Sequence, residues 1–469
     1  MPTRGRPTLV EHLPTSTPSS TASIGADAPP RREHLLGGWG RVPLVPGRER
    51  RSEDLETLSR DLPLARGLGR AYGDAALPAP GDFEVAGTTL ADRILAFDPD
   101  TQILTAEAGY SLDALCRDFL PRGYFTPVTP GTRFVTIGGM AACDVHGKNH
   151  HVAGTFGRHV QALKVRTGDG RLVSCSPAEH PDLFYATIGG MGLTGLICEV
   201  TVRLSRIPSP WVYAERQRVR DIDEFIDTLR TSSTNWPMTV GWIDCLARGR
   251  HLGRGVLFRG RWAERHEAPD TAPGTLAGPD LPMDFPTFVL RPLTVRTFNA
   301  VLYRRYALGQ STGIVHPFRF FYPLDAIGHW TRMYGRRGFT QYQCVLPESG
   351  GHAAARRFLE LLTARGGASF LCVIKDCGAE GDGLLSFPKA GISIALDIPM
   401  RDATPGLVDA LNELVIAEGG RVYLAKDALT RPEHFRAMEP RLDRFLAVRR
   451  TWDPDGRIRS AQSVRLFGW

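Results

Sequence analysis

The hydrophobic pattern of the chain divides it into two regions. Before residue 208, apolar and polar positions alternate in short runs, and this two-residue period predicts β-strands. Two stretches have helical spacing instead: 111–120, with Ser111 as the N-cap, and 181–187. Residues 130–159 hold six glycines and four histidines and show almost no helical pattern. The strands are expected near 62–65, 92–97, 102–107, 161–166, 171–175 and 196–204.

The sequence ProSerPro at 208–210 marks a boundary, after which the strands are longer and aromatic residues are more frequent. Two stretches there, 357–367 and 404–420, each predict a helix that ends in glycine and is followed by a strand. These two strands end at Lys375 and Lys426, each followed by aspartate. This alternation predicts an α+β domain. We divide the chain into a disordered leader at 1–33, structured parts at 34–209 and 210–415, and a C-terminal segment at 416–469.

Composition limits the classes of function. The chain has 469 residues, of which 42% are hydrophobic and 23% charged, and no window approaches the roughly 18 apolar residues of a membrane span. The net charge of +7 is spread out, which fits a solvated surface or attraction to phosphates or an anionic membrane. Without a basic stripe, nucleic acid is not an expected partner. The eight cysteines lack CxxC spacing and predict free thiols.

Three glycine-rich turns lie in the N-terminal region, at 66–74, 130–139 and 188–195. Glycine lets the main chain come close to a ligand, and accessible N–H groups form nests for phosphate oxygens. A Walker loop is absent, and the strand–GxGxxG–helix context of a Rossmann fold is missing. Together the turns predict a dinucleotide held by a different fold.

The order of these motifs resembles the vanillyl-alcohol-oxidase-type FAD flavoproteins. The matching motifs are ArgGlyLeuGlyArgAlaTyrGlyAsp at 66–74, ProGlyThrArg-x-Val-Thr-Ile-Gly-Gly at 130–139 and AspLeuPheTyrAlaThr-x-Gly-Gly-x-Gly at 182–192. CysAspValHisGlyLysAsnHisHis at 143–151, SerPhePro at 386–388 and TyrLeuAlaLysAsp at 423–427 sharpen the match. They are similar to the branch that oxidises the 2′-hydroxyl of polyprenyl-phosphoryl ribose to a keto sugar, in the synthesis of cell-wall arabinan precursors.

The resemblance implies a two-part FAD-binding domain, formed by 34–209 and 416–469, with an inserted α+β substrate domain at 210–415. It also implies a keto-sugar reductase as partner, a quinone-type electron acceptor, and peripheral contact with a membrane. The N-terminus has no apolar core for a secretory signal, so we expect a cytoplasmic or membrane-peripheral protein, with the periplasmic side left open. FAD contacts are expected at Ala65, Arg66, Gly67, Leu68, Gly69, Arg70, Ala71, Tyr72, Gly73, Asp74, Ala75, Gly131, Thr136, Ile137, Gly138, Gly139, Cys143, Asp144, Val145, His146, Ile197 and Tyr423.

Alcohol oxidation by a flavin needs a group that removes the hydroxyl proton. His146, Tyr72 and Lys426 are the candidates by their place in the matched motifs, and Lys426 could instead place positive charge beside the flavin. No carboxylate or cysteine with ligand spacing accompanies His146, so no metal is expected. Many relatives tether the flavin through a histidine where this chain has Arg70, so the FAD is expected to be non-covalent.

Gln341 and Gln343 are two residues apart in a predicted strand and therefore share a face. They could face a sugar or the solvent. Relatives carry a cysteine in the segment where this chain has Ala395, and that difference leaves the identity of the sugar open. The residues expected to contact substrate are Gln341, Gln343, Lys375, Trp242, Phe321 and Lys148.

Three alternatives compete with this interpretation. One is an oxygen-using alditol or aldonolactone oxidase of the same flavoprotein class. Another is a polyprenyl-phosphate-binding protein that keeps the fold without catalysis. A nicotinamide dehydrogenase is the most distant alternative, because its fingerprint is missing.

Overall fold

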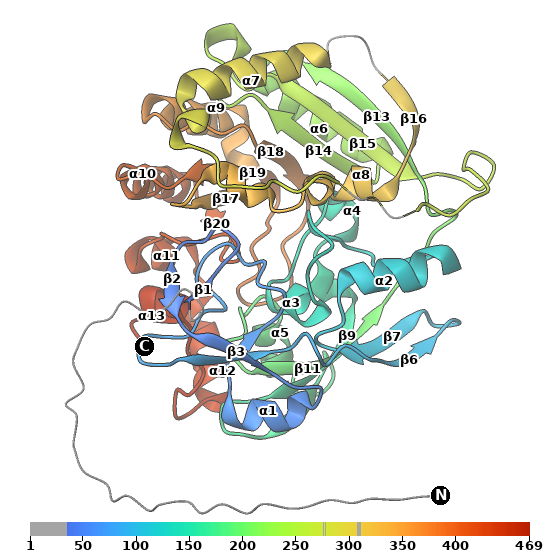
Figure 1. Cartoon of the computed structure of the whole chain (residues 1–469), viewed down its shortest axis with the longest axis vertical. Coiled ribbons are helices and arrows are strands. Elements are labelled where there is room, and N and C mark those ends of the chain that lie inside the picture. The colour runs from blue at the N-terminus through green and yellow to red at the C-terminus, as the bar shows by residue number, and fades with distance from the viewer. Residues whose placement is uncertain (1–34, 275, 277, 307–310) are drawn as a thin grey trace, which may run out of the picture.

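The computed structural model describes residues 35–274, 276, 278–306 and 311–469. The leader expected at 1–33 lies outside the described residues. Two units face each other (Figure 1). The first unit comprises residues 35–209 together with the C-terminal residues 423–469, and the second unit comprises the described residues of 211–422. Helices and strands are mixed in both, which agrees with the predicted α+β class.

The first unit contains two main sheets. A parallel sheet has the order β3-β5-β4, and an antiparallel sheet has the order β10-β9-β11-β7-β6. The strands are β3 (Arg48–Arg51), β4 (Ala65–Arg66), β5 (Glu84–Gly87), β6 (Ile94–Asp98), β7 (Ile103–Glu107), β9 (Val160–Arg166), β10 (Leu172–Cys175) and β11 (Leu196–Arg203). Two small pairs, β1 (Leu35–Gly37) with β2 (Leu44–Pro46) and β8 (Tyr124–Phe125) with β12 (Ser205–Arg206), complete the unit. Its helices before residue 209 are α1 (Leu55–Asp61), α2 (Leu112–Phe119), α3 (Ile137–Ala142), α4 (His150–Ala153) and α5 (Pro181–Thr187).

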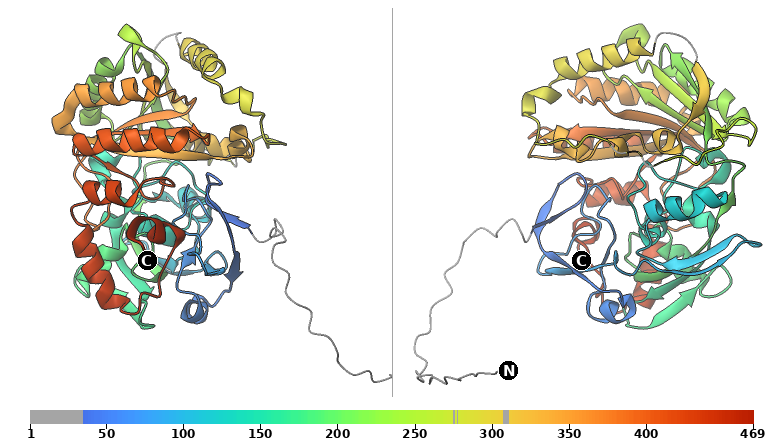
Figure 2. Two further views of the ribbon diagram at one scale, coloured as in Figure 1. Left: turned by 90° about the vertical axis from the view of Figure 1, so that its left-hand side faces the viewer. Right: turned by 45° about the vertical axis from the view of Figure 1, so that its right-hand side comes forward.

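The second unit is built on one eight-stranded sheet with the order β16-β13-β15-β14-β18-β19-β17-β20. Its strands are β13 (Val212–Val219), β14 (Met238–Ile243), β15 (Gly255–Trp262), β16 (Ser311–Val315), β17 (Phe339–Pro347), β18 (Cys372–Cys377), β19 (Gly391–Pro399) and β20 (Arg421–Val422). Its helices are α6 (Ile222–Asn235), α7 (Pro292–Arg305), α8 (Pro317–Phe321), α9 (Gly351–Ala364) and α10 (Thr404–Ala417). Helices α6, α9 and α10 pack on the sheet, and α7 lies at the end of the molecule farthest from the first unit (Figures 1 and 2).

The C-terminal helices α11 (Pro432–Met438), α12 (Leu442–Trp452) and α13 (Ala461–Phe467) return to the first unit (Figure 1). Helix α12 packs against α5, and Trp452 Nε1 donates to Asp182 Oδ2 at 2.9 Å. Helix α10 runs across the boundary expected at 415/416, and β20 still pairs with β17. The chain therefore leaves the second unit after Val422.

The periodicity of the sequence located most of the first unit's elements within a few residues. Ser111 caps α2 as expected, and its hydroxyl accepts from Ala114 N. Two expectations were wrong. The segment 62–65 is not a strand, since α1 precedes it and only Ala65 belongs to β4. The segment 130–159 is not free of helix, because it contains α3 and α4.

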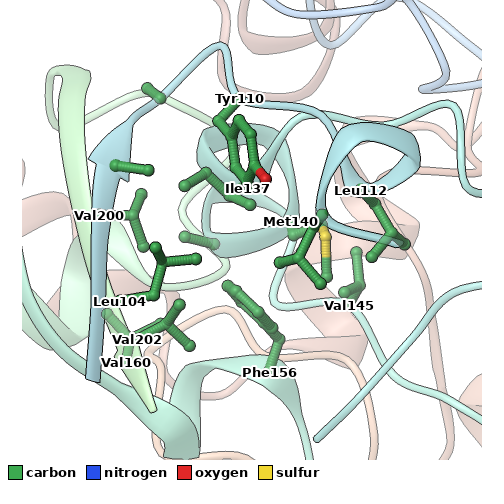
Figure 3. Packing of buried hydrophobic residues seen from close by; sticks show 14 of the residues in the cluster. Leu104, Tyr110, Leu112, Ile137, Met140, Val145, Phe156, Val160, Val200 and Val202 are labelled. Carbon is green, nitrogen blue, oxygen red and sulfur yellow. The ribbon is translucent and has the colours of Figure 1, made fainter. Parts of the chain in front are cut away.

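Helix α3 forms in the glycine-rich segment because tertiary packing outweighs the low helix propensity of glycine. Thr136 caps it, with its hydroxyl accepting from Gly139 N. Ile137 and Met140 point into the core among Leu104, Val200 and Val202 of β7 and β11 (Figure 3). The buried side of α3 thus fixes the loop before it against the antiparallel sheet.

Among the described residues, no helix is long and apolar enough to cross a membrane. All eight cysteines are free, as the spacing predicts, and seven of them are buried.

Candidate functional site

A cavity of about 1100 Å³ lies where the two units meet. Its walls combine the three glycine-rich turns and the turn after β20 with the sheet of the second unit. Successive side chains of β17 point to opposite faces of the sheet, and this determines which of them line the cavity. Tyr342 points toward α10, where its hydroxyl donates to Asn412 Oδ1, so Gln341 and Gln343 point to the opposite face and line the cavity.

The turn at 66–74 offers main-chain donors to the cavity. Within the described part of the chain, the N–H groups of Gly67 to Ala71 have no acceptor. A side chain could not replace Gly67, because its Cβ would lie 2.5 Å from Thr136 Oγ1. At Gly138 a Cβ would lie 2.7 Å from the Ala108 Cβ. This arrangement of free N–H groups in a close-packed turn fits the phosphates of a dinucleotide.

His146 is buried in the cavity wall with an exposed fraction of 5%. The amide nitrogen of Gln343 lies 2.8 Å from His146 Nε2 and also donates to Ser393 Oγ at 3.1 Å. His146 Nε2 therefore accepts a hydrogen bond from Gln343, and its Nδ1, which has no partner among the described residues, carries the ring hydrogen. Burial lowers the pKa of His146 well below its usual value, with help from the charges of Lys375 and Lys426. The imidazole is neutral at pH 7.

Lys426 lies over the ring of Tyr72, with its Nζ 3.8 Å from the ring centroid. Burial lowers the pKa of Lys426 to about 7, and the carboxylate of Asp397 opposes this shift. Both the ammonium and the amine of Lys426 are thus populated near neutral pH. Burial raises the pKa of Tyr72 well above its usual value, so its phenol keeps its proton.

Asp397 fixes the orientation of Gln341. Gln341 Nε2 donates to Asp397 Oδ1 at 2.5 Å, and Tyr334 Oη donates to Asp397 Oδ2 at 2.7 Å. The Asp397 side chain is fully buried, and burial raises its pKa to about 6. Because the amide nitrogen of Gln341 is held by Asp397, its carbonyl oxygen remains available as an acceptor.

Two more lysines face the cavity. Lys148 Nζ donates to the carbonyl of Phe321 at 2.9 Å, and burial lowers the pKa of Lys148 to about 7. Burial also lowers the pKa of Lys375, which lies near enough to lower that of Lys148. All three lysines have lost solvation, and too few carboxylates surround them to balance their charge. Such an environment favours a bound anion.

An ion-pair clamp joins two segments of the cavity wall. Arg465 of α13 binds Asp74, which follows the first glycine-rich turn, and Asp427, which follows Lys426, with all three N–O distances at 2.8 Å. Tyr72 N also donates to Ala425 O at 2.8 Å. The contact is so close that a Cβ on Gly73 would lie 1.9 Å from Asp427 O.

The structure brings together all three candidate catalytic residues, all six candidate substrate residues and most of the candidate FAD contacts. Five of the candidate FAD contacts do not line the cavity, because each makes its contacts elsewhere. Arg66 pairs with Glu49 at 2.7 Å, Asp74 binds Arg465, Gly73 packs on Asp427, and Ile137 points into the core. Asp144 accepts from Gly157 N at 2.8 Å and from the Ser386 hydroxyl.

The histidines after His146 do not form a metal site. His150 Nδ1 accepts from Gly378 N at 3.0 Å, and His151 Nε2 is 2.9 Å from Trp236 O. No group of three or more potential metal ligands is found among the residues that the structure describes.

Sequence reasoning missed Asp397, Ser393 and the Arg465 clamp. Asp397 carried a signal, since it is the only charged residue in the apolar strand 391–399. The clamp carried none, because Arg465 is 391 positions from Asp74.

Several known proteins are similar to this chain in sequence. Residues 60–176 match the FAD binding domain family. The decaprenylphosphoryl-beta-D-ribose oxidase of Mycolicibacterium smegmatis is 34% identical over 461 residues, which cover 93% of this chain and 98% of that protein. Shorter matches cover a putative D-arabinono-1,4-lactone oxidase of Neurospora crassa (30% identity, 24% of this chain and 20% of that protein) and cytokinin dehydrogenase 4 of Arabidopsis thaliana (30% identity, 31% of this chain and 28% of that protein).

The chain is therefore an FAD-dependent oxidoreductase with an α+β two-domain flavoprotein fold. It belongs to the family of the decaprenylphosphoryl-β-D-ribose oxidase of M. smegmatis. The predictions of the family, the fold class and FAD as cofactor are confirmed.

The lowered pKa of Lys426 should make the free energy of unfolding depend on pH. A lysine with a pKa near 10.5 in the unfolded chain and about 7 in the folded protein binds more protons when unfolded between these pH values. The free energy of unfolding therefore rises with pH from 7 to 9, by at most about 1.4 kcal/mol per pH unit for each such lysine. We expect a smaller slope in Lys426→Met, measured by urea denaturation with excess FAD.

Lys164→Met is the matched control. Ion pairs with Glu56 and Glu199 raise the pKa of Lys164 to about 12, so it is protonated in both states below pH 9. Its removal leaves the slope unchanged. Equal slopes in wild type and Lys426→Met would show that Lys426 is not desolvated.

Proposed function

We propose that this protein uses FAD to oxidise the 2′-hydroxyl of decaprenylphosphoryl-β-D-ribose, or of a related polyprenyl-phosphoryl sugar, to the 2′-keto sugar. The observation that carries the proposal is the convergence of His146, Lys426 and the two glutamines on one cavity that also contains the free N–H groups at 67–71. The M. smegmatis relative, which this chain covers almost completely, bears this substrate in its name.

The residues divide the chemistry between them. When bound, FAD supplies the acceptor for the hydride that leaves C2′. The hydroxyl proton must go to a base, and Lys426 is the best of the three candidates. Its amine form is populated near pH 7, whereas Tyr72 stays protonated. His146 has no free lone pair for the proton, because Gln343 donates to its Nε2 and its buried Nδ1 carries the hydrogen. In this proposal Lys426 takes the proton.

The same cavity offers groups for the rest of the substrate. Lys148 and Lys375 provide the positive charge that a phosphodiester requires. The carbonyl oxygens of Gln341 and Gln343 suit sugar hydroxyls, since their amide nitrogens are already engaged. Trp242 and Phe321 add apolar walls, and Trp242 is held by a hydrogen bond from its Nε1 to Phe370 O at 2.9 Å.

Ala395 stands on β19 directly opposite Gln343 and lines the cavity. We infer that the small side chain leaves room for the sugar and that the redox step needs no thiol at this position. The identity of the pentose is set by the neighbouring glutamines and by Ser393, which accepts from Gln343.

Further parts of the proposal follow from the reaction. A keto-sugar product calls for a reductase that converts it to the arabinose epimer, and a quinone-type acceptor would reoxidise the flavin. A substrate with a long lipid calls for peripheral contact with a membrane. In the domain organisation that we propose, 34–209 and the C-terminal segment bind FAD and the inserted segment binds the substrate, with the boundary expected at 415/416 moved to follow Val422.

A second candidate is an oxidase of alditols or aldonolactones, which the similarity to the N. crassa protein favours. That similarity covers only 24% of this chain. A soluble polyol also gives the lysines of the cavity no anion to bind. A third candidate is a protein that binds polyprenyl phosphate without catalysis. Such a protein would have no use for a lysine whose pKa is lowered to about 7, as that of Lys426 is.

Anaerobic titration with a polyprenyl-phosphoryl ribose tests the proposed reaction. The flavin absorption band should bleach on addition of this substrate and should not bleach with free alditols. Because general-base catalysis contributes about 10²- to 10⁴-fold, Lys426→Met should slow bleaching by about a hundredfold or more. Lys389→Met, at a lysine that donates to Gly419 O away from the cavity, should bleach at the wild-type rate. Wild-type protein whose flavin stays oxidised with this substrate would contradict the proposal.

We also infer that the FAD is bound non-covalently. Arg70 occupies the position of the tethering histidine, its guanidinium lies 3.9 Å from the Trp39 ring centroid, and its Nη1 donates to Leu68 O. Guanidinium does not form the flavin linkage that imidazole does. Acid precipitation should leave the yellow colour in the supernatant, and colour retained in the pellet would refute non-covalent binding.

A further inference from the structure

The exposed large apolar side chains gather on one segment of the second unit. Of the eleven that the described residues expose, five lie between 283 and 301. Leu293 is 73% exposed and Val301 is 60% exposed, although isolated apolar residues are usually more covered than this. We call this set the apolar strip, and its members are Met283, Phe288, Leu293, Phe298 and Val301.

Helix α7 carries three residues of the apolar strip and presents them outward. Its inner side is fixed by Val295 and by Asn299, whose Nδ2 donates to Asp244 Oδ1 at 3.0 Å. Leu293 and Val301 are eight residues apart and therefore lie on the same side of the helix, two turns from each other. The helix stands at the outer end of the second unit (Figure 2).

The exposed charges on α7 and at its N-cap are all positive, and the nearby Asp284 is paired with Arg41. Arg291, Arg296, Arg304 and Arg305 are exposed, and none has an ion-pair partner among the described residues. Helix α7 contains no acidic residue. Exposed apolar side chains flanked by unpaired arginines are the composition of a helix that lies in the interface of an anionic membrane.

The cavity reaches the same helix. The residues that line the cavity cross the sheet from Ala395 on β19 to β16, by way of β18, β14, β15 and β13. These are five steps between neighbouring strands, which together span roughly 24 Å. At this far end Leu302 and Tyr306, at the C-terminal end of α7, line the cavity. Tyr306 packs edge-on against Phe258 of β15, with ring centroids 5.8 Å apart. The C-terminal end of α7 thus borders the cavity, while the outer side of the helix bears Leu293, Phe298 and Val301 of the apolar strip.

We propose that the apolar strip docks the protein on the surface of an anionic lipid bilayer, so that a polyprenyl chain passes from the bilayer along α7 into the cavity. This inference rests on the proposed function for its substrate. It adds the surface that contacts the membrane and the direction of entry. The FAD-binding unit faces away from the bilayer in this orientation (Figure 1).

Vesicle binding tests the docking surface. The flavin-loaded protein is sedimented with phosphatidylcholine vesicles that contain or lack phosphatidylglycerol. We expect binding that needs the anionic lipid and weakens with added salt. The double variant Leu293→Ser, Val301→Ser should bind about tenfold or more weakly, because each change removes apolar area that the bilayer buries. The matched control is Leu90→Ser, Leu95→Ser, at side chains that are 48% and 44% exposed in the first unit.

The outcomes separate docking from catalysis. A short-chain, water-soluble polyprenyl-phosphoryl ribose should be oxidised equally by wild type and by Leu293→Ser, Val301→Ser, while the variant should show a raised KM for the long-chain substrate in vesicles. If wild type oxidises neither substrate, the proposed function fails, and the vesicle comparison still decides the docking surface. Undiminished vesicle binding by the double variant would overturn the inference. The inference would also be overturned if wild type were a dimer, the double variant a monomer, and vesicle binding the same in both. A second copy of the chain would then cover the apolar strip.

Discussion

The clamp that Arg465 forms with Asp74 and Asp427 is the interaction on which the site depends. Asp74 follows the first glycine-rich turn, and Asp427 follows Lys426, so one guanidinium fixes the position of two walls of the cavity. The clamp explains why the C-terminal helices return to the first unit: without α13, neither carboxylate would have its partner. The distance between the first glycine-rich turn and the amine of Lys426 is set by this buried contact.

The electrostatics of the cavity follow from the same construction. Lys148, Lys375 and Lys426 are desolvated, and the pKa of each is lowered. Without an anion, these surroundings favour the neutral forms of the lysines. In the reaction that we propose, a phosphate at Lys148 and Lys375 would restore the charge of those two groups, while Lys426 keeps the amine form that a base needs. Asp397 limits the lowering of the pKa of Lys426 and, through Gln341, orients a carbonyl acceptor toward the cavity.

The sequence predicted the parts of the fold that local pattern determines. Alternation located β6, β7 and β9 to β11, and the spacing of apolar residues with Ser111 located α2. Local pattern failed at α3, where glycines lower helix propensity and the packing of Ile137 and Met140 on the sheet outweighs it. The resemblance of the motifs to a known family predicted which residues meet at the site. The clamp could not be predicted from one sequence, because Arg465 is 391 residues from Asp74 and 38 residues from Asp427.

The affinity for FAD of an Arg465→Ala variant tests the clamp most directly, with Arg459→Ala as control, since Arg459 makes only an exposed pair with Asp82 at 3.3 Å. Removing Arg465 leaves two buried carboxylates unpaired, and loss of about 1.4 kcal/mol of binding free energy corresponds to a tenfold change in Kd. We expect folded Arg465→Ala protein, verified by circular dichroism, to bind FAD at least about tenfold more weakly than wild type, and Arg459→Ala to bind it equally. A folded Arg465→Ala protein with wild-type affinity for FAD would contradict this account.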